Sequence, residues 1–135
     1  MVNDLWINLP VKDMKRSREF FAKLGLQPMP LGDDMTSIAF GEKKVIVVLC
    51  SEAMFTGFVG NRVADARANN ELLVSLGVAS RDAVDELAKK AREAGAALFA
   101  EPAEHQGWMY GCGFVDLDGH RWNVVHMDFS KMPER

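Results

Sequence analysis

Apolar residues in the first half of the chain recur with a period of two in some stretches and at helical spacing in another. Period-two alternation is typical of a strand with one buried face, whereas spacing of three to four residues is typical of an amphipathic helix. These patterns predict a strand over residues 5–11, a helix over 14–24 and strands over 35–40 and 44–49, the last two joined by a tight turn at Gly41–Glu42. Asp13 is typical of a helix N-cap, and Gly25 is typical of a helix end.

The second half repeats this order of patterns, so that Leu9 corresponds to Leu76 and Asp13 to Ser80, an offset of 67 residues. The predicted elements are a strand over residues 71–79, a helix over 81–94, a strand over 96–100, a loop over 101–107 and strands over 110–116 and 121–127. A repeat predicts that both halves share one geometry. The sequence therefore predicts one α+β domain of two βαβββ modules, residues 4–50 and 71–128, whose curved mixed sheet surrounds a concave pocket and has the helices on its outer face.

Residues 51–70 connect the two modules and include the aromatic residues Phe55 and Phe58 among glycines and polar residues. A loop of this length in a small domain is usually functional or mobile. The alternative is a short amphipathic helix that covers the sheet.

The last two predicted strands flank Asp118–Gly119, a strong hairpin signal. A two-residue type I′ turn pairs Phe114 with Asn123, whereas a type I turn with a bulge at Gly119 pairs Gly113 with Asn123 and leaves room for a ligand. Asn123 is either a polar anchor for such a ligand or a buried amide bonded to neighbouring backbone. Asp116 and Arg121 are expected to form a cross-strand ion pair.

Composition limits the classes of function. The chain has 135 residues and a net charge of −3, and no Lys/Arg block indicates a nucleic-acid partner. No apolar run is long enough to span a bilayer, and no signal peptide is evident, so a cytoplasmic location is expected. Cys50 and Cys112 are expected to be free thiols, either small buried apolar residues or, with a base nearby, nucleophiles.

Residues 8–26, NLPVKDMKRSREFFAKLGL, and 113–128, GFVDLDGHRWNVVHMD, resemble the vicinal oxygen chelate superfamily, which includes glyoxalase I, bleomycin-resistance proteins, fosfomycin-resistance enzymes and extradiol dioxygenases. The resemblance covers nearly the whole chain. It implies the paired βαβββ fold and a homodimer.

The resemblance also implies four points at which metal-dependent members place their ligands. In this sequence they fall on Trp6, Leu73, Asn123 and either Leu49 or Cys50. A divalent metal prefers His nitrogen or carboxylate oxygen, so no metal site or cofactor is expected at these points. A rearranged divalent-metal site could instead draw on His105, Glu104 or His126.

An aromatic-lined pocket with a few hydrogen-bonding groups is the main prediction about function. The predicted pocket residues are Trp6, Asn8, Phe55, Phe58, Leu73, Ser75, Trp108, Tyr110 and Asn123. The alternative interpretation of the aromatic residues is a core or a dimer interface.

Three hypotheses follow. The first is a metal-independent binder of a small apolar or aromatic molecule, as bleomycin-resistance proteins sequester a drug. The second is a glyoxalase-like lyase or isomerase, or a dioxygenase-like enzyme, with the rearranged metal site. The third is a metal-free enzyme in which His105 or Tyr110 transfers a proton; the alternative for His105 is a solvated loop residue.

Overall fold

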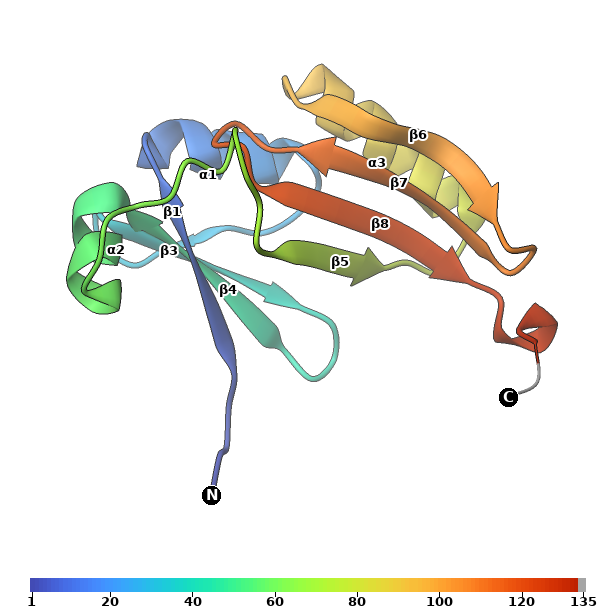
Figure 1. Cartoon of the computed structure of the whole chain (residues 1–135), viewed down its shortest axis with the longest axis horizontal. Helices are drawn as coiled ribbons and strands as arrows, with labels where there is room; N and C mark the ends of the chain where they lie inside the picture. The colour runs from blue at the N-terminus through green and yellow to red at the C-terminus, as the bar shows by residue number, and fades with distance from the viewer. Residues whose placement is uncertain (134–135) are drawn as a thin grey trace. The chain divides into compact units, whose positions relative to one another are not determined.

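The computed structural model describes residues 1–133, which form two compact units that meet in sequence at Asp65 and Ala66. Each unit contains one four-stranded mixed sheet and at least one helix packed on it (Figure 1). The α+β class and the repeat predicted from the sequence are confirmed. Each sheet begins with a strand that pairs in parallel with the last strand of its own unit.

The first unit, called module one below, has its sheet in the order β1-β4-β3-β2. Its elements are β1 (Trp6–Val11), α1 (Met14–Lys23), β2 (Met29–Pro30), β3 (Met35–Phe40), β4 (Val45–Ser51) and α2 (Glu52–Val59). Helix α1 begins because the Asp13 side chain accepts a hydrogen bond from the backbone N–H of Arg16. Its apolar stripe, Phe20 and Phe21, packs on buried β-strand residues and forms the core of the unit.

A single cation holds the connection between β2 and β3 in module one. The Nε of Arg18 on α1 donates to the hydroxyl oxygen of buried Thr36 at 2.5 Å. Its Nη2 donates to the backbone carbonyls of Gly32 at 2.6 Å and Met35 at 2.9 Å. One guanidinium thus satisfies three acceptors from one short stretch of chain.

Helix α2 decides between the two interpretations of residues 51–70. Residues 52–59 form a helix, which Ser51 caps by accepting from the backbone N–H of Met54, and which ends at left-handed Gly60. The helix packs on β1 and β4. Residues 52–59 are therefore helical, as the second interpretation predicted, whereas residues 60–70 form neither helix nor strand.

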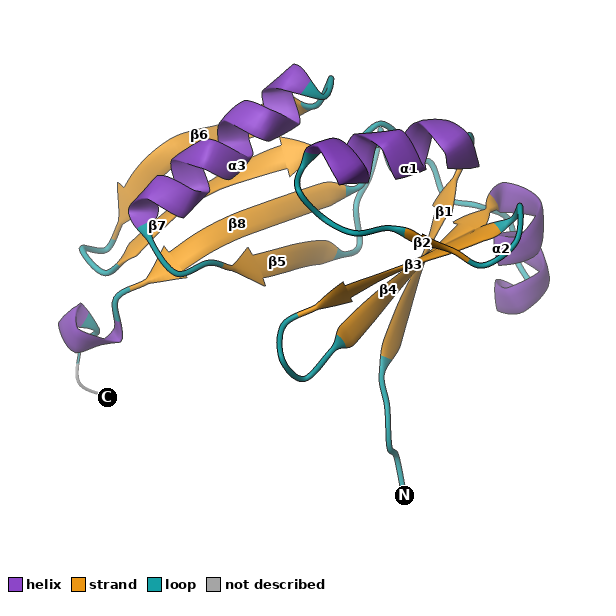
Figure 2. Cartoon of the chain, turned by 180° about the vertical axis from the view of Figure 1, so that it is seen from behind, coloured by secondary structure: helices purple, strands orange, loops and turns teal. Residues whose placement is uncertain are grey.

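The second unit, module two, has its sheet in the order β5-β8-β7-β6. Its elements are β5 (Leu73–Gly77), α3 (Arg81–Glu93), β6 (Ala97–His105), β7 (Met109–Val115), β8 (Arg121–Met127) and a short 3₁₀ helix (Phe129–Lys131). Figure 2 shows α3 lying across one face of this sheet, where it packs on β6, β7 and β8. Ser80 caps α3 as predicted, by accepting from the backbone N–H of Ala83.

Strand β6 is longer than the sequence predicted. It runs to His105, so the predicted loop over residues 101–107 is wrong for most of its length. Its pairing with β7 shifts register twice, between Leu98 and Ala100 and between Ala100 and Ala103. These bulges break the period-two alternation, which is why the pattern ended at residue 100.

The hairpin of β7 and β8 has the register with a bulge at Gly119. Gly113 pairs with Asn123, and Gly119 has a φ of +92°, a conformation that glycine adopts without strain. The predicted ion pair of Asp116 with Arg121 is wrong. Asp116 is only 4% exposed and accepts hydrogen bonds from the backbone N–H groups of Asp118 and His120 and from the Nε1 of Trp122, so the carboxylate closes the turn from inside.

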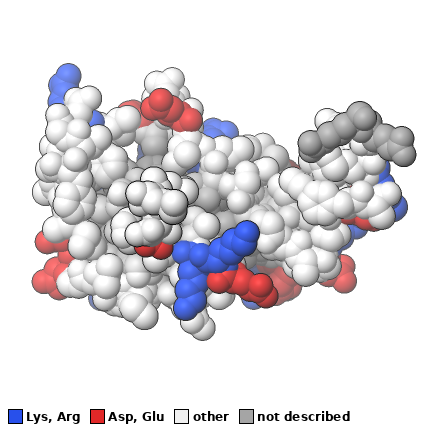
Figure 3. Space-filling model, turned by 90° about the horizontal axis from the view of Figure 1, so that it is seen from below, with Lys and Arg blue, Asp and Glu red and all other residues white. Residues whose placement is uncertain are grey.

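The helices of residues 1–133 are all too short or too polar to cross a lipid bilayer. On the face of the molecule shown in Figure 3, Lys and Arg side chains lie beside Asp and Glu and form no extended basic patch.

Candidate functional site

The sheet of module two has one face that α3 does not cover, called the open face below. Cross-strand partners share a face of a sheet, and side chains alternate along each strand. The register therefore puts Arg121, Asn123, Val125 and Met127 of β8 on this face, together with Leu73, Ser75 and Gly77 of β5 and Met109, Gly111, Gly113 and Val115 of β7. Trp122 and Val124, which alternate with them, are buried on the α3 side.

A hollow of about 440 Å³ lies on the open face. It is lined by Ser75, Leu76, Gly77, Val78, Met109, Asn123, Val125, Met127 and Phe129. Ser75 and Asn123 are direct partners in the β5–β8 ladder. Within residues 1–133 no protein group is hydrogen-bonded to either side chain, so both can bond to a ligand. A hollow of this kind, mainly apolar with two adjacent polar groups, is suited to a small organic molecule.

One aromatic residue that the sequence analysis missed lies beside Gly113, the ladder partner of Asn123. Phe99, in the first bulge of β6, covers Gly113, and a Cβ built on Gly113 would lie 2.3 Å from the ring. The space predicted at Gly113 is therefore filled by this ring. The Cζ of Arg121 lies 4.6 Å from the centre of the same ring, a cation–π contact.

A second hollow, of about 300 Å³, lies at the beginning of α3. It is lined by Ala79, Ser80, Arg81, Asp82, Trp108, Tyr110, His126 and Asp128. Two of the predicted pocket residues, Trp108 and Tyr110, thus lie here and not in the hollow that contains Asn123. The reason is the register: Tyr110 pairs with His126, on the α3 side of the sheet.

Tyr110 is held by charged neighbours. Its hydroxyl donates to a carboxylate oxygen of Asp85 at 2.6 Å, and the guanidinium of Arg81 lies over its ring at 4.9 Å. The hydrogen bond to Asp85 raises the pKa of Tyr110 above its ordinary value, and desolvation adds a smaller rise. A phenol with a raised pKa is less suited to proton transfer near neutral pH, which weakens Tyr110 as a candidate acid/base residue.

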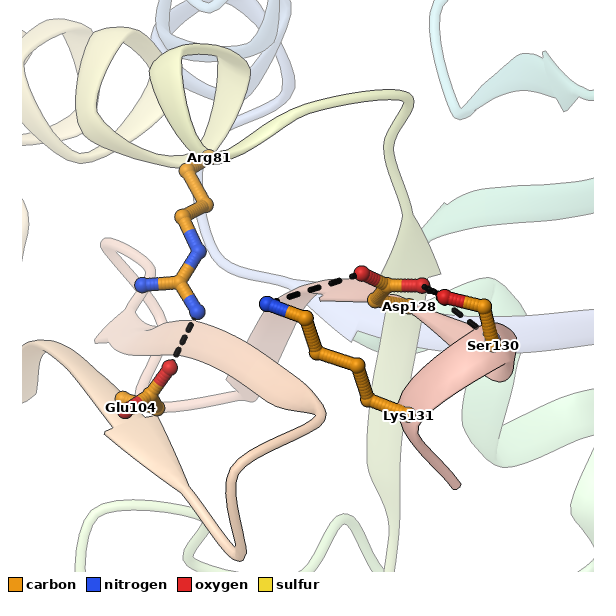
Figure 4. A network of polar contacts seen from close by, with 5 residues as sticks. All are labelled: Arg81, Glu104, Asp128, Ser130 and Lys131. Atoms are coloured by element: carbon orange, nitrogen blue, oxygen red, sulfur yellow. Dashed lines mark hydrogen bonds and ion pairs between the residues drawn. The ribbon is translucent and has the colours of Figure 1, made fainter.

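Two ion pairs border the second hollow (Figure 4). Arg81 bonds to Glu104, while Asp128 accepts from Ser130 and lies 4.0 Å from the Nζ of Lys131. The bond to Arg81 lowers the pKa of Glu104. Two of the charged residues that line the hollow, Arg81 and Asp128, are therefore already paired. The Nε1 of Trp108 is buried without a partner among the described residues.

The predicted pocket residues of module one lie on β1 and α2. Trp6 and Phe58 are 57% and 62% exposed, on β1 and α2 respectively. Asn8 is exposed on β1, where its Oδ1 lies 3.9 Å from the Sγ of Cys50, and Phe55 is half-buried on α2. Of the nine predicted residues, Ser75 and Asn123 are the two that the open-face hollow brings together; Leu73 lies on the same face, beside Arg121.

The residues at the four points where the resemblance implies metal ligands do not fit a divalent cation. Trp6 and Leu73 have no suitable donor atom, and Asn123 has a neutral amide. At the fourth point Cys50, not Leu49, shares a face with Asn8, and burial raises the pKa of its thiol. The thiolate that a metal would need is therefore disfavoured.

The rearranged metal set is not assembled either. Glu104 faces Arg81 on the α3 side, whereas His105, its neighbour on β6, points to the opposite face. The Nδ1 of His126 lies 3.1 Å from the backbone carbonyl of Val78. Across residues 1–133 no three His, Cys, Asp or Glu side chains lie together in a group that could hold a metal ion.

Both cysteines are free and buried, as predicted. Burial raises the pKa of Cys112 to about 11 and also raises that of Cys50. We expect a thiol reagent such as 5,5′-dithiobis(2-nitrobenzoate) to modify the native protein at pH 8 at least ten times more slowly than the urea-unfolded protein, because the thiolates are both scarce and inaccessible. Rapid modification of one thiol in the native protein would contradict this and would restore that cysteine as a candidate nucleophile.

Comparison with known proteins identifies the fold. No family model matches the chain, and no curated protein sequence matches it. Solved structures do match. Hypothetical protein SA1046 from S. aureus is 34% identical, with a TM-score of 0.83 over 93% of this chain and 94% of that chain.

Two further structures carry a family name. A glyoxalase-related enzyme from Fulvimarina pelagi is 16% identical, with a TM-score of 0.79 over 93% of this chain and 88% of that chain. A glyoxalase/bleomycin resistance protein/dioxygenase family enzyme from Burkholderia phytofirmans PsJN is 19% identical, with a TM-score of 0.75 over 93% of this chain and 100% of that chain. At these identities the likeness concerns the fold.

The chain therefore has the fold of the glyoxalase/bleomycin resistance/dioxygenase structures, as the sequence resemblance predicted. It belongs to the same family as the S. aureus protein, which it matches over nearly the full length of both chains.

Proposed function

We propose that this protein binds a small, mainly apolar organic molecule in the open-face hollow of module two and does so without a divalent metal. The observation that carries the proposal is the pair Ser75 and Asn123, whose side chains have no bonding partner among the described residues and lie together in an otherwise apolar hollow. Their hydroxyl and amide can each donate and accept, which would orient a ligand.

The apolar part of the hollow supplies most of the affinity in this proposal. Met109, Val125, Met127 and Phe129 line it, and burial of about 100 Å² of apolar ligand surface against such side chains is worth about 2.5 kcal/mol. The side chains of the two methionines can adapt to ligands of different shape.

Gly77 offers a way to close the hollow without disturbing the protein. It lines the hollow, and a Cβ built on it meets nothing within 4 Å. The substitution Gly77→Leu therefore fills the space from the β5 side. We expect it to weaken binding of the neutral fluorescent probe N-phenyl-1-naphthylamine at least tenfold in a fluorescence titration, with the melting temperature unchanged within a few degrees.

Gly57 provides the matched control, because a Cβ there also meets nothing within 4 Å and α2 lies outside the hollow. Gly57→Leu should bind the probe as the wild type does. Absence of saturable one-to-one binding by the wild type, or equal binding by Gly77→Leu, would overturn the proposal.

A further inference from the structure

The open face of module two has one charged side chain on strands β5, β7 and β8. The register puts eleven residues of these strands on this face, and Arg121 is the single one that is ionised at neutral pH. It lies two positions before Asn123 on β8 and pairs with Leu73 and Val115. On these three strands the open face is therefore neutral except for a cation two positions from Asn123.

Phe99 fixes where this cation lies. The ring touches Gly113, the ladder partner of Asn123, and also lies under the Arg121 guanidinium. The guanidinium is thereby held beside the Gly113–Asn123 pair instead of extending into solvent. A guanidinium over an aromatic ring keeps the N–H groups in its plane available as a fork for a carboxylate.

The guanidinium has no acidic partner in the described part of the chain. Arg121 is half-buried and contacts the ring of Phe99, and no carboxylate of residues 1–133 forms an ion pair with it. Arg81 and Arg92, by contrast, are paired with Glu104 and Glu101. A partly buried cation without a counter-charge is expected to attract an anion.

We propose that the ligand of the open-face hollow is an organic acid, with a carboxylate that contacts Arg121 and an apolar body that extends toward Val125 and Met127. The inference rests on the proposed function, because it assigns a ligand class to the same hollow. Four residues separate Arg121 from Val125 along β8, or roughly 13 Å at about 3.3 Å per residue. After the reach of the arginine side chain is allowed for, this span suits an acid with a short aryl-alkyl body.

The test compares 4-phenylbutyrate with 4-phenylbutanamide, which differ in charge but hardly in shape. Each compound competes with N-phenyl-1-naphthylamine for the full-length protein in low-salt buffer. We expect the carboxylate to bind at least tenfold more tightly than the amide to the wild type, and 0.5 M NaCl to reduce this preference. Arg121→Gln should lower the preference to about one and leave the affinity for the amide within twofold of the wild type.

Arg121→Lys keeps the charge and should retain a several-fold preference for the carboxylate, so it separates the loss of charge from a disturbance of the hairpin. Equal binding of both compounds to the wild type would overturn the organic-acid inference while leaving the hollow as a binding site. Failure of the probe and of both compounds to bind would overturn the proposed function itself.

Discussion

Replacement of Asp116 with alanine is expected to lower the free energy of unfolding by about 3–5 kcal/mol. The carboxylate is buried and accepts from three donors, the backbone N–H groups of Asp118 and His120 and the indole of Trp122. Alanine would remove the acceptor of all three of these hydrogen bonds in the turn between β7 and β8. Urea denaturation measures the loss, and hydrogen exchange should accelerate first in residues 109–127.

The control for this variant is Glu42→Ala in the turn between β3 and β4. Glu42 is an acid in the corresponding hairpin of module one, but it is exposed. Its replacement should change the free energy of unfolding by less than about 0.5 kcal/mol. A loss below about 1 kcal/mol in Asp116→Ala would show that water replaces the carboxylate and would contradict the prediction.

The pH dependence of Asp116→Asn tests the electrostatics of the same site. Burial raises the pKa of Asp116 above its usual value of 3.8; the charge of His120 and the hydrogen bonds oppose this but do not cancel it. The carboxyl group of Asp116 thus binds its proton more tightly in the folded protein than in the unfolded chain. Its contribution to stability is therefore full below the usual value of 3.8 and falls as the pH rises through the raised pKa. The free energy of unfolding of the wild type, relative to that of Asp116→Asn, should therefore increase as the pH is lowered. A difference that shrinks would mean that the hydrogen bonds outweigh burial.

In module one, Arg18→Ala is expected to lower the free energy of unfolding by about 2–4 kcal/mol. Each hydrogen bond to a charged donor contributes about 1.5–3 kcal/mol, and the total is smaller than the sum because this site is partly solvated. The variant removes the donors to Thr36, Gly32 and Met35. Among the described residues, the hydroxyl of buried Thr36 would then retain its 3.3 Å contact with the sulfur of Met14. Urea denaturation measures the change, and hydrogen exchange should accelerate in β2 and β3.

Two variants of the same helix complete this experiment. Arg18→Lys keeps the charge but lacks the fork that reaches three acceptors, so we expect an intermediate loss. Lys15→Ala removes an exposed cation from α1 and should change stability by less than about 0.5 kcal/mol. If Lys15→Ala and Arg18→Ala have equal effects, the hydrogen bonds of Arg18 do not hold the β2–β3 connection.

The fold was predictable where one local signal decided it. Asp13 and Ser80 mark the helix starts, and the alternating strands needed no tertiary information. Strand β2 and the second half of β6 lack such a signal and were missed. Strand β2 has two residues, one of them Pro30. In β6 the pairing with β7 shifts register at two bulges, so apolar and polar positions no longer alternate there.

The candidate site was predictable in part. Ser75 and Asn123 followed from alternation and the repeat, and the structure pairs them. Tyr110 was assigned to the same face in error, although it lies three positions from Gly113 and must face the other way in a regular strand. Phe99 could not be found from alternation because it lies in a bulge; the glycine at 113 was the available signal, since glycine in a strand often marks a close approach.

The parallel pairing of the first and last strand in each module has a consequence for synthesis. A ribosome releases β1 early, but its ladder partner β4, Val45–Ser51, follows only after α1 and two further strands, and β5 waits in the same way for β8. Such long loops must close before the parallel ladder can form, which makes it a late and slow contact. The strand of each module that is synthesised first is therefore the last to be paired in its sheet. In a nascent chain that pauses before Val45, the apolar residues of β1, Leu9 and Val11, lack their parallel partner strand, and the apolar stripe of α1 lacks a complete sheet to pack on.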